Sequence, residues 1–183
     1  YWASEYHIDG FRFDLMGLHD CDTMNQIRYA LDEINPQILM YGEAWDLKTA
    51  CDDGTALETQ ANMDKLDSRI GAFDDTVRDA IKGNTFDATD KGFLASGKKT
   101  GNIKIGLSGE CVNGWASAPT QSVVYSSCHD NYTLYDKLVS SLYPDEKDFR
   151  KRHANLVEMT KLNAATIFSA QGMTFFLAGE EFC

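Results

Sequence analysis

The stretch HIDGFRFD, residues 7–14, sets the pattern from which the fold can be predicted. Phe11 and Phe13 alternate with polar residues, as in a half-buried β-strand, and the strand ends on Asp14. A helix is predicted to follow from about Asp22, because apolar residues then recur at near-helical spacing as far as Ile34. The unit therefore consists of a short strand, an acidic residue at its end, and a helix.

The same unit begins again at residues 38–43, ILMYGE, a continuous apolar run that ends on Glu43. Such a run is typical of a strand buried on both faces. Asn35 and Pro36 end the preceding helix. The separation of Asp14 and Glu43, 43 − 14 = 29 residues, matches about one βαβ unit.

Three further strands and two further helices are predicted along the rest of the chain. The strands are placed at residues 70–73, 122–127 and 173–177, and the long second helix at about 149–170 with Gly172 as its C-cap. The first of these helices is capped by Asp74 and Asp75 and stops at Gly83. Residues 84–118 are rich in Gly, Lys and Thr and are predicted to be mostly loop.

Strands that alternate with helices predict an α/β fold with a parallel sheet. The two architectures that compete are a doubly wound open sheet and a (β/α)8 barrel. Acidic residues at the carboxyl ends of several strands favour the barrel, because a barrel gathers those ends around one pocket. An open sheet would bring fewer of them together at its switch point.

Three carboxylates, Asp14, Glu43 and Asp130, are candidate catalytic residues because each follows a predicted strand. Two carboxyl groups on either side of a glycosidic bond are what a glycoside hydrolase needs. Arg12 leaves the same face of its strand as Asp14, so its guanidinium is expected beside that carboxylate. Each residue also has a structural interpretation: an Asp at such a junction often caps a helix, Arg12 could form a structural ion pair, and His129 could be an ordinary core or loop histidine.

The composition excludes several classes of function. Lys and Arg number 17 against 28 Asp and Glu, so the net charge of −11 argues against a nucleic-acid or anionic-lipid partner. No apolar run approaches a membrane span. The five cysteines are widely spaced and include no C-x-x-C pair, which fits neither a disulfide framework nor a zinc site. They slightly favour the cytoplasm over secretion. No Gly-x-Gly-x-x-Gly follows a strand, so a nucleotide-binding protein is disfavoured.

Several motifs resemble those of the alpha-amylase superfamily of glycoside hydrolases (family 13), and most closely those of type I pullulanases. DGFRFDLMG at residues 9–17 is similar to the motif of barrel strand four, and YGEAWD at 41–46 to that of strand five. SCHDN at 127–131 resembles the strand-seven motif. FDDTVRDAIKG at 73–83 and AGEEF at 178–182 resemble the segments after strand six and at the end of strand eight.

The resemblance implies roles for individual residues. Asp14 would be the nucleophile, Glu43 the proton donor and Asp130 the third, transition-state-stabilising carboxylate. Arg12 and His129 would be supporting substrate contacts. The aromatic rings of Trp45 and Tyr125 are candidates for stacking on sugars, although core packing is an equal alternative for each.

The resemblance also implies a fragment. Residues 1–183 would be the part of a catalytic barrel domain from about strand four to strand eight, without strands one to three and the C-terminal parts. The implied activity is retaining hydrolysis of α-1,6-glucosidic linkages in pullulan and branched α-glucans, and the isolated fragment is expected to be inactive. The alternatives are an isoamylase-like or α-1,4-acting hydrolase and a non-catalytic α-glucan-binding relative. The expected partner is an α-glucan, and no cofactor or metal at the site is expected, with a structural calcium possible in the full-length enzyme.

Overall fold

The protein has an α/β fold, seen in a computed structural model that describes residues 1–49 and 54–182. In this part of the chain the strands are β1 (Gly10–Phe13), β2 (Leu39–Gly42), β3 (Ile70–Phe73), β4 (Ser122–Val124) and β5 (Met173–Thr174). The α-helices are α1 (Trp2–Tyr6), α2 (Cys21–Asp32), α3 (Asp75–Lys82), α4 (Phe93–Ser96), α5 (Thr100–Leu107), α6 (Leu134–Leu142) and α7 (Ala154–Phe168). Short 3₁₀ helices are η1 (Met16–Leu18), η2 (Gln60–Lys65), η3 (Pro119–Gln121) and η4 (Glu180–Phe182).

The strands form one parallel sheet in which each strand pairs with the next one along the chain, in the order β1-β2-β3-β4-β5. A doubly wound sheet would reverse direction at a switch point, and within the described residues the order does not reverse. The sheet also curls: the ring of Phe73 in β3 lies 4.8 Å from that of Tyr125 and 5.2 Å from that of Phe175, beyond β5. The prediction of a parallel α/β sheet is confirmed, and the curled arc is compatible with part of a barrel.

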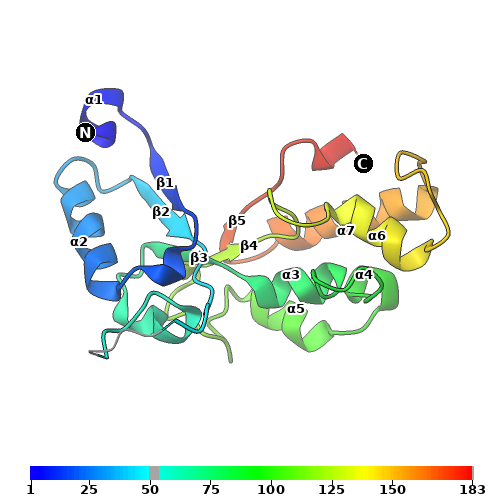
Figure 1. The fold of residues 1–183 in the computed structure, drawn as a ribbon, viewed down its shortest axis with the longest axis horizontal. Helices are drawn as coiled ribbons and strands as arrows, with labels where there is room; N and C mark the ends of the chain where they lie inside the picture. The colour runs from blue at the N-terminus through cyan, green and yellow to red at the C-terminus, as the bar shows by residue number, and fades with distance from the viewer. Residues whose placement is uncertain (50–53, 183) are drawn as a thin grey trace.

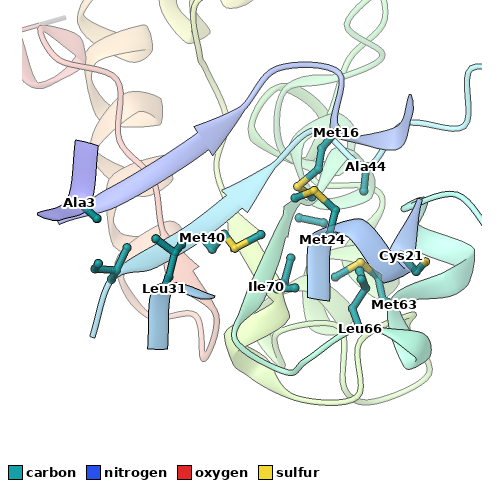
Figure 2. Packing of buried hydrophobic residues seen from close by; sticks show 12 residues of the cluster. Ala3, Met16, Cys21, Met24, Leu31, Met40, Ala44, Met63, Leu66 and Ile70 are labelled. Carbon is teal, nitrogen blue, oxygen red and sulfur yellow. The ribbon is translucent and has the colours of Figure 1, made fainter. Parts of the chain in front are cut away.

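Helix α2 covers the N-terminal half of the sheet. Its N-cap is Asp20, whose side chain accepts a hydrogen bond from the Thr23 amide at 2.7 Å. Met24 and Leu31 point from the helix into a core shared with Met40 of β2 and Ile70 of β3. Figure 2 shows these side chains in one layer between helix and sheet.

A second core lies under the C-terminal helices, which Figure 1 shows grouped on the opposite side of the molecule from α2. It includes helices α4 and α5, two short helices that were not predicted within residues 84–118, most of which are loop as predicted. The two glycines of α5 lower its helix propensity, but packing outweighs this. A Cβ at Gly106 would lie 2.3 Å from Val77 Cγ2, so the missing side chain lets α5 lie against α3.

The structure corrects other predicted elements. Helix α6 and helix α1 were not predicted, and α7 begins at Ala154 and ends at Phe168, inside the expected 149–170, with Ser169 rather than Gly172 at its C-cap. Strands β4 and β5 are shorter than predicted. The capped helix after β3 is confirmed, since the Asp74 side chain accepts from the Val77 amide at 2.9 Å and Gly83 follows the last residue.

The prediction that the second strand is buried on both faces is wrong for β2. Met40 is buried against α2, but Leu39, on the concave face, is 54% exposed. On the same face Tyr41 packs with Phe73, Tyr125 and other aromatic side chains, whereas Leu39 is not part of this cluster. The residues of β2 are therefore apolar on both faces of the strand, although one of these faces is partly exposed to solvent in this chain.

None of the helices in the described residues is long and apolar enough to cross a membrane. Cys21, Cys111 and Cys128 are free thiols. Cys51 and Cys183 lie outside the described residues, and the prediction of the cytoplasm stays a prediction.

Candidate active site

A cleft of about 700 Å³ lies at the carboxyl ends of the strands and contains all three predicted carboxylates. Asp14 follows β1, Glu43 follows β2, and Asp130 lies six residues beyond the end of β4, since 130 − 124 = 6. The side chains of Asp14 and Asp130 are 64% and 62% exposed, whereas that of Glu43 is 5% exposed. The cleft thus presents two accessible carboxylates beside one that the protein largely encloses.

Arg12 joins the first two carboxylates. Its Nη1 donates to Asp14 Oδ1, and its Nη2 donates to Glu43 Oε1 at 2.5 Å. The alternation of side chains along β1 places Arg12 and Asp14 on one face, as predicted. The second oxygen of Glu43 accepts a hydrogen bond from the Leu15 amide at 2.8 Å. Both oxygens of Glu43 are therefore held in fixed positions.

The turn after Asp14 brings the first two strand ends together. Leu15 adopts a left-handed conformation with φ 49°, which turns the chain sharply after the strand. The Gly17 amide then donates to the Glu43 carbonyl oxygen at 2.9 Å. A Cβ at Gly17 would lie 2.2 Å from the Trp45 carbonyl oxygen, so only glycine permits this approach.

His129 lies between the first and third carboxylates. Its Nε2 is 3.6 Å from Asp14 Oδ1 and 3.6 Å from Asp130 Oδ1. One donor atom each of Asp14, Glu43 and His129 lies within 4.8 Å of the others, a spacing that could also hold a metal ion. The guanidinium of Arg12 already contacts Asp14 and Glu43, so these two carboxylates have a cation between them without a metal.

The two predicted aromatic residues occupy different environments. Trp45 is half-buried and lines the cleft. Tyr125 also lines it but is 1% exposed and packs on Phe73, which fits the core-packing alternative for this residue. Between them lies Arg78, whose guanidinium carbon is 5.8 Å from the centre of the Trp45 ring and 5.9 Å from that of Tyr125.

Helix α3 supplies cleft residues that were not predicted as site residues. Arg78 and Lys82, one turn apart, both line the cleft. Arg78 Nη1 donates to the Tyr125 hydroxyl at 3.1 Å, and its Nε donates to Asp79 Oδ1 at 2.7 Å. Their spacing of four residues after a strand end was the available signal, because it places both side chains on one helix face.

The chain is similar to pullulanases over its whole length. It is 40% identical to the pullulanase of Bacillus subtilis (strain 168) in an alignment that covers 100% of this chain and 25% of that protein. The chain is pullulanase-like. This confirms the predicted similarity to pullulanases, which are glycosidases.

Solved structures show the same relationship. A pullulanase from Anoxybacillus sp. LM18-11 complexed with maltotetraose matches with a TM-score of 0.88 and 38% identity, over 100% of this chain and 25% of that one. A mutant pullulanase from Paenibacillus barengoltzii complexed with maltotetraose matches with a TM-score of 0.88 and 42% identity, over 99% of this chain and 28% of that one. No family model matches the sequence. The pullulanase-like chain thus spans about a quarter of the length of these relatives.

Proposed function

We propose that the protein containing this chain is a retaining glycoside hydrolase that cleaves α-1,6-glucosidic linkages in pullulan and branched α-glucans. The observation that carries the proposal is the meeting of Asp14, Glu43 and Asp130 in one cleft of a pullulanase-like chain. The bound maltotetraose in two similar structures supports an α-glucan as the substrate. Residues 1–183 would supply strands four to eight of a (β/α)8 barrel, the other parts of the catalytic domain coming from elsewhere in the full-length protein.

The spacing of the carboxylates supports retention of configuration. A carboxyl oxygen of Asp14 and one of Glu43 lie within 4.8 Å of each other. Retaining enzymes place their two carboxyl groups about 5–5.5 Å apart, whereas inverting enzymes leave a wider gap of about 6.5–9.5 Å for a water molecule. Asp14 would attack the anomeric carbon, and Glu43 would protonate the leaving oxygen and then activate the water that releases the sugar.

The remaining cleft residues take supporting roles in this proposal. The negative charge of Asp130 would stabilise the oxocarbenium-like transition state, and His129, between Asp130 and Asp14, would contact the same sugar. Arg12 would hold the carboxylates of Asp14 and Glu43 in fixed positions relative to each other. The half-buried ring of Trp45 is the better candidate for stacking on a sugar, because Tyr125 is enclosed by the core.

No catalytic step in this proposal needs a metal or cofactor. A structural calcium elsewhere in the full-length enzyme stays a prediction, as does a cytoplasmic location.

The test is the substitution Asp14→Asn in the full-length protein. We expect pullulan hydrolysis to be lost, because the variant lacks the nucleophile, while the melting temperature stays near the wild-type value because Asp14 is exposed. Reducing-sugar release from pullulan and thermal unfolding measure the two properties. Pullulan hydrolysis at the wild-type rate by the variant would refute the assignment of Asp14.

The products of glucan hydrolysis distinguish the proposed function from its alternatives. An isoamylase-like or α-1,4-acting enzyme would release a different set of oligosaccharides from pullulan, amylose and branched dextrin than an α-1,6-specific enzyme. A non-catalytic relative would bind these glucans and release none. Chromatography of the products from the three substrates decides among them.

A further inference from the structure

Lys82 is a buried cation on the wall of the cleft and takes no part in the chemistry proposed above. It is the last residue of α3 and is only 1% exposed, although its side chain lines the cleft. In residues 1–49 and 54–182 no carboxylate oxygen lies within 4.0 Å of its Nζ. Burial, reinforced by the charge of Arg78, lowers the pKa of Lys82 to about 8. Burying an ammonium group without a carboxylate partner costs stability, so the position of Lys82 needs an explanation.

The contact that Lys82 makes points to the loop carrying the third carboxylate. Lys82 Nζ donates a hydrogen bond to the Tyr132 carbonyl oxygen at 3.1 Å. Tyr132 lies two residues after Asp130, in a segment without helix or strand in which Asn131 has a left-handed φ of 63°. A second hydrogen bond closes the base of this loop, from the Leu134 amide to Ser127 Oγ at 2.7 Å. The loop at residues 128–133 is therefore held at its base by Ser127 and, two residues before Leu134, by Lys82.

Other charges around Lys82 favour its cationic form without binding it directly. Asp79 lies on the same helix, and Glu180 lies in η4, beyond β5. Glu180 Oε1 accepts hydrogen bonds from Ser126 Oγ at 3.1 Å and from Asn163 Nδ2 at 3.2 Å, whereas its Oε2 has no hydrogen-bond partner among the described residues. The Lys82 ammonium makes its hydrogen bond to the loop carbonyl, and a charged donor makes the stronger hydrogen bond.

We propose that Lys82 is a positioning residue that fixes the loop at residues 128–133, so that Asp130 and His129 face the carboxylates of the first two strands. The inference deepens the proposed function, since it assumes that Asp130 acts on the substrate. Without the ammonium, the loop would keep the contact of Ser127 with Leu134 but lose its attachment at Tyr132. Asp130 would then be displaced while the rest of the cleft stayed in place.

The experiment compares two buried lysines in the full-length protein. Lys137 of α6 is the matched control, because it is 0% exposed and its Nζ also donates to a backbone carbonyl oxygen, that of Asp87. Lys137 does not line the cleft. The variants are Lys82→Met, Lys82→Arg and Lys137→Met, and the measurements are kcat and KM on pullulan and hydrogen exchange of the amides in residues 128–133.

We expect Lys82→Met to lower kcat by about 10- to 100-fold, the size of effect that misplacing a catalytic group by about 1 Å can have, with a smaller change in KM. Hydrogen exchange in the loop should become faster. Lys82→Arg should recover most of kcat, because it restores a charged donor. Lys137→Met should leave kcat and loop exchange near their wild-type values, even if it lowers the melting temperature as much as Lys82→Met does.

Three results would overturn the inference. These are wild-type kcat and loop exchange in Lys82→Met, equal losses of kcat in the two methionine variants, and no recovery in Lys82→Arg. If Lys82→Met does not fold, Lys82→Gln takes its place, and equal kcat in the Gln and Arg variants counts against the inference. If the wild-type protein does not hydrolyse pullulan, the proposed function is refuted. Faster loop exchange in Lys82→Met but not in Lys137→Met would then still support the positioning role.

Discussion

Glu58 shows at the scale of one residue how the fold tolerates an acid in its core. The residue is 0% exposed, and neither of its carboxyl oxygens has a hydrogen-bond partner among the described residues. Burial raises the pKa of Glu58 to about 8. The folded chain therefore keeps this carboxyl protonated at neutral pH, whereas in the unfolded chain its pKa is the ordinary glutamate value of 4.5.

This difference predicts a pH-dependent stability. Between about pH 4.5 and 8 the folded state binds one proton more than the unfolded state at Glu58, so the contribution of this residue to stability falls as the pH rises. Glu58→Gln should remove that dependence, and the variant should gain stability relative to the wild type as the pH is raised. Urea unfolding at several pH values measures the effect.

The exposed Glu33 at the end of α2 provides the control, and Glu33→Gln should leave the pH dependence unchanged. A Glu58→Gln variant whose stability follows that of the wild type at every pH would contradict the burial argument.

At the scale of elements, the turn at η1 connects the first two strand ends more tightly than the sheet alone does. The amides of Leu15 and Gly17 both donate to Glu43, one to its side chain and one to its carbonyl oxygen. Gly17 also packs against the Trp45 backbone. A single short turn thus fixes the proposed proton donor, Glu43, and the backbone of Trp45, two residues further on.

Gly17→Ala is predicted to disrupt this turn. The added Cβ would lie 2.2 Å from a backbone oxygen, so the turn must shift, at a cost of about 1–3 kcal/mol in unfolding free energy. We also expect a loss of kcat, because the Leu15 amide would move away from Glu43. Chemical unfolding and kinetics on pullulan measure the two effects in the full-length protein.

Gly101 of α5 is the matched control, since a Cβ there meets nothing within 4 Å. Gly101→Ala should stabilise the helix slightly, by up to about 1 kcal/mol. A Gly17→Ala variant that behaves like Gly101→Ala would show that the turn is not restrained as described.

The sequence allowed the order of the strands, the capped helix α3 and the meeting of the three carboxylates in one cleft to be predicted, because each depends on local patterns such as alternation, an Asp cap or a conspicuous motif. It did not reveal α5, because two glycines hide a helix whose stability comes from packing on α3. It did not reveal the part played by Lys82 either. That contact joins residues 50 positions apart, and no local pattern encodes it.

At the scale of the whole molecule, the chain exposes apolar groups at both edges of the arc. Trp2 of α1 and Leu39 of β2 are exposed near one edge. At the other, Phe168 is 62% exposed and its ring lies 5.4 Å from that of Phe176, beyond β5. Strands β1 and β5 pair on one side only in the described part of the chain. Unpaired strands beside apolar side chains favour association with other chains.

We therefore predict that residues 1–183, prepared alone, associate in solution and do not hydrolyse pullulan. The double variant Leu39→Lys and Phe168→Lys should associate less, because charge at both edges opposes pairing. Tyr29→Lys, on the solvent-exposed side of α2, is the control and should change association little. Sedimentation and light scattering measure the association of each chain, and a monomeric wild-type chain would refute the prediction.

The order of the strands along the chain has a consequence for how the protein is made. Because each strand pairs with the one synthesised just before it, the sheet can grow in the direction of translation, one strand and its helices at a time. In the described residues each strand pairs with the strand before it, although paired residues of β3 and β4, and of β4 and β5, are 50 positions apart, since 122 − 72 = 50 and 173 − 123 = 50. The cleft would be completed late in synthesis. Helix α3 would already be folded when the segment after β4 emerges and Asp130 takes its place in the cleft.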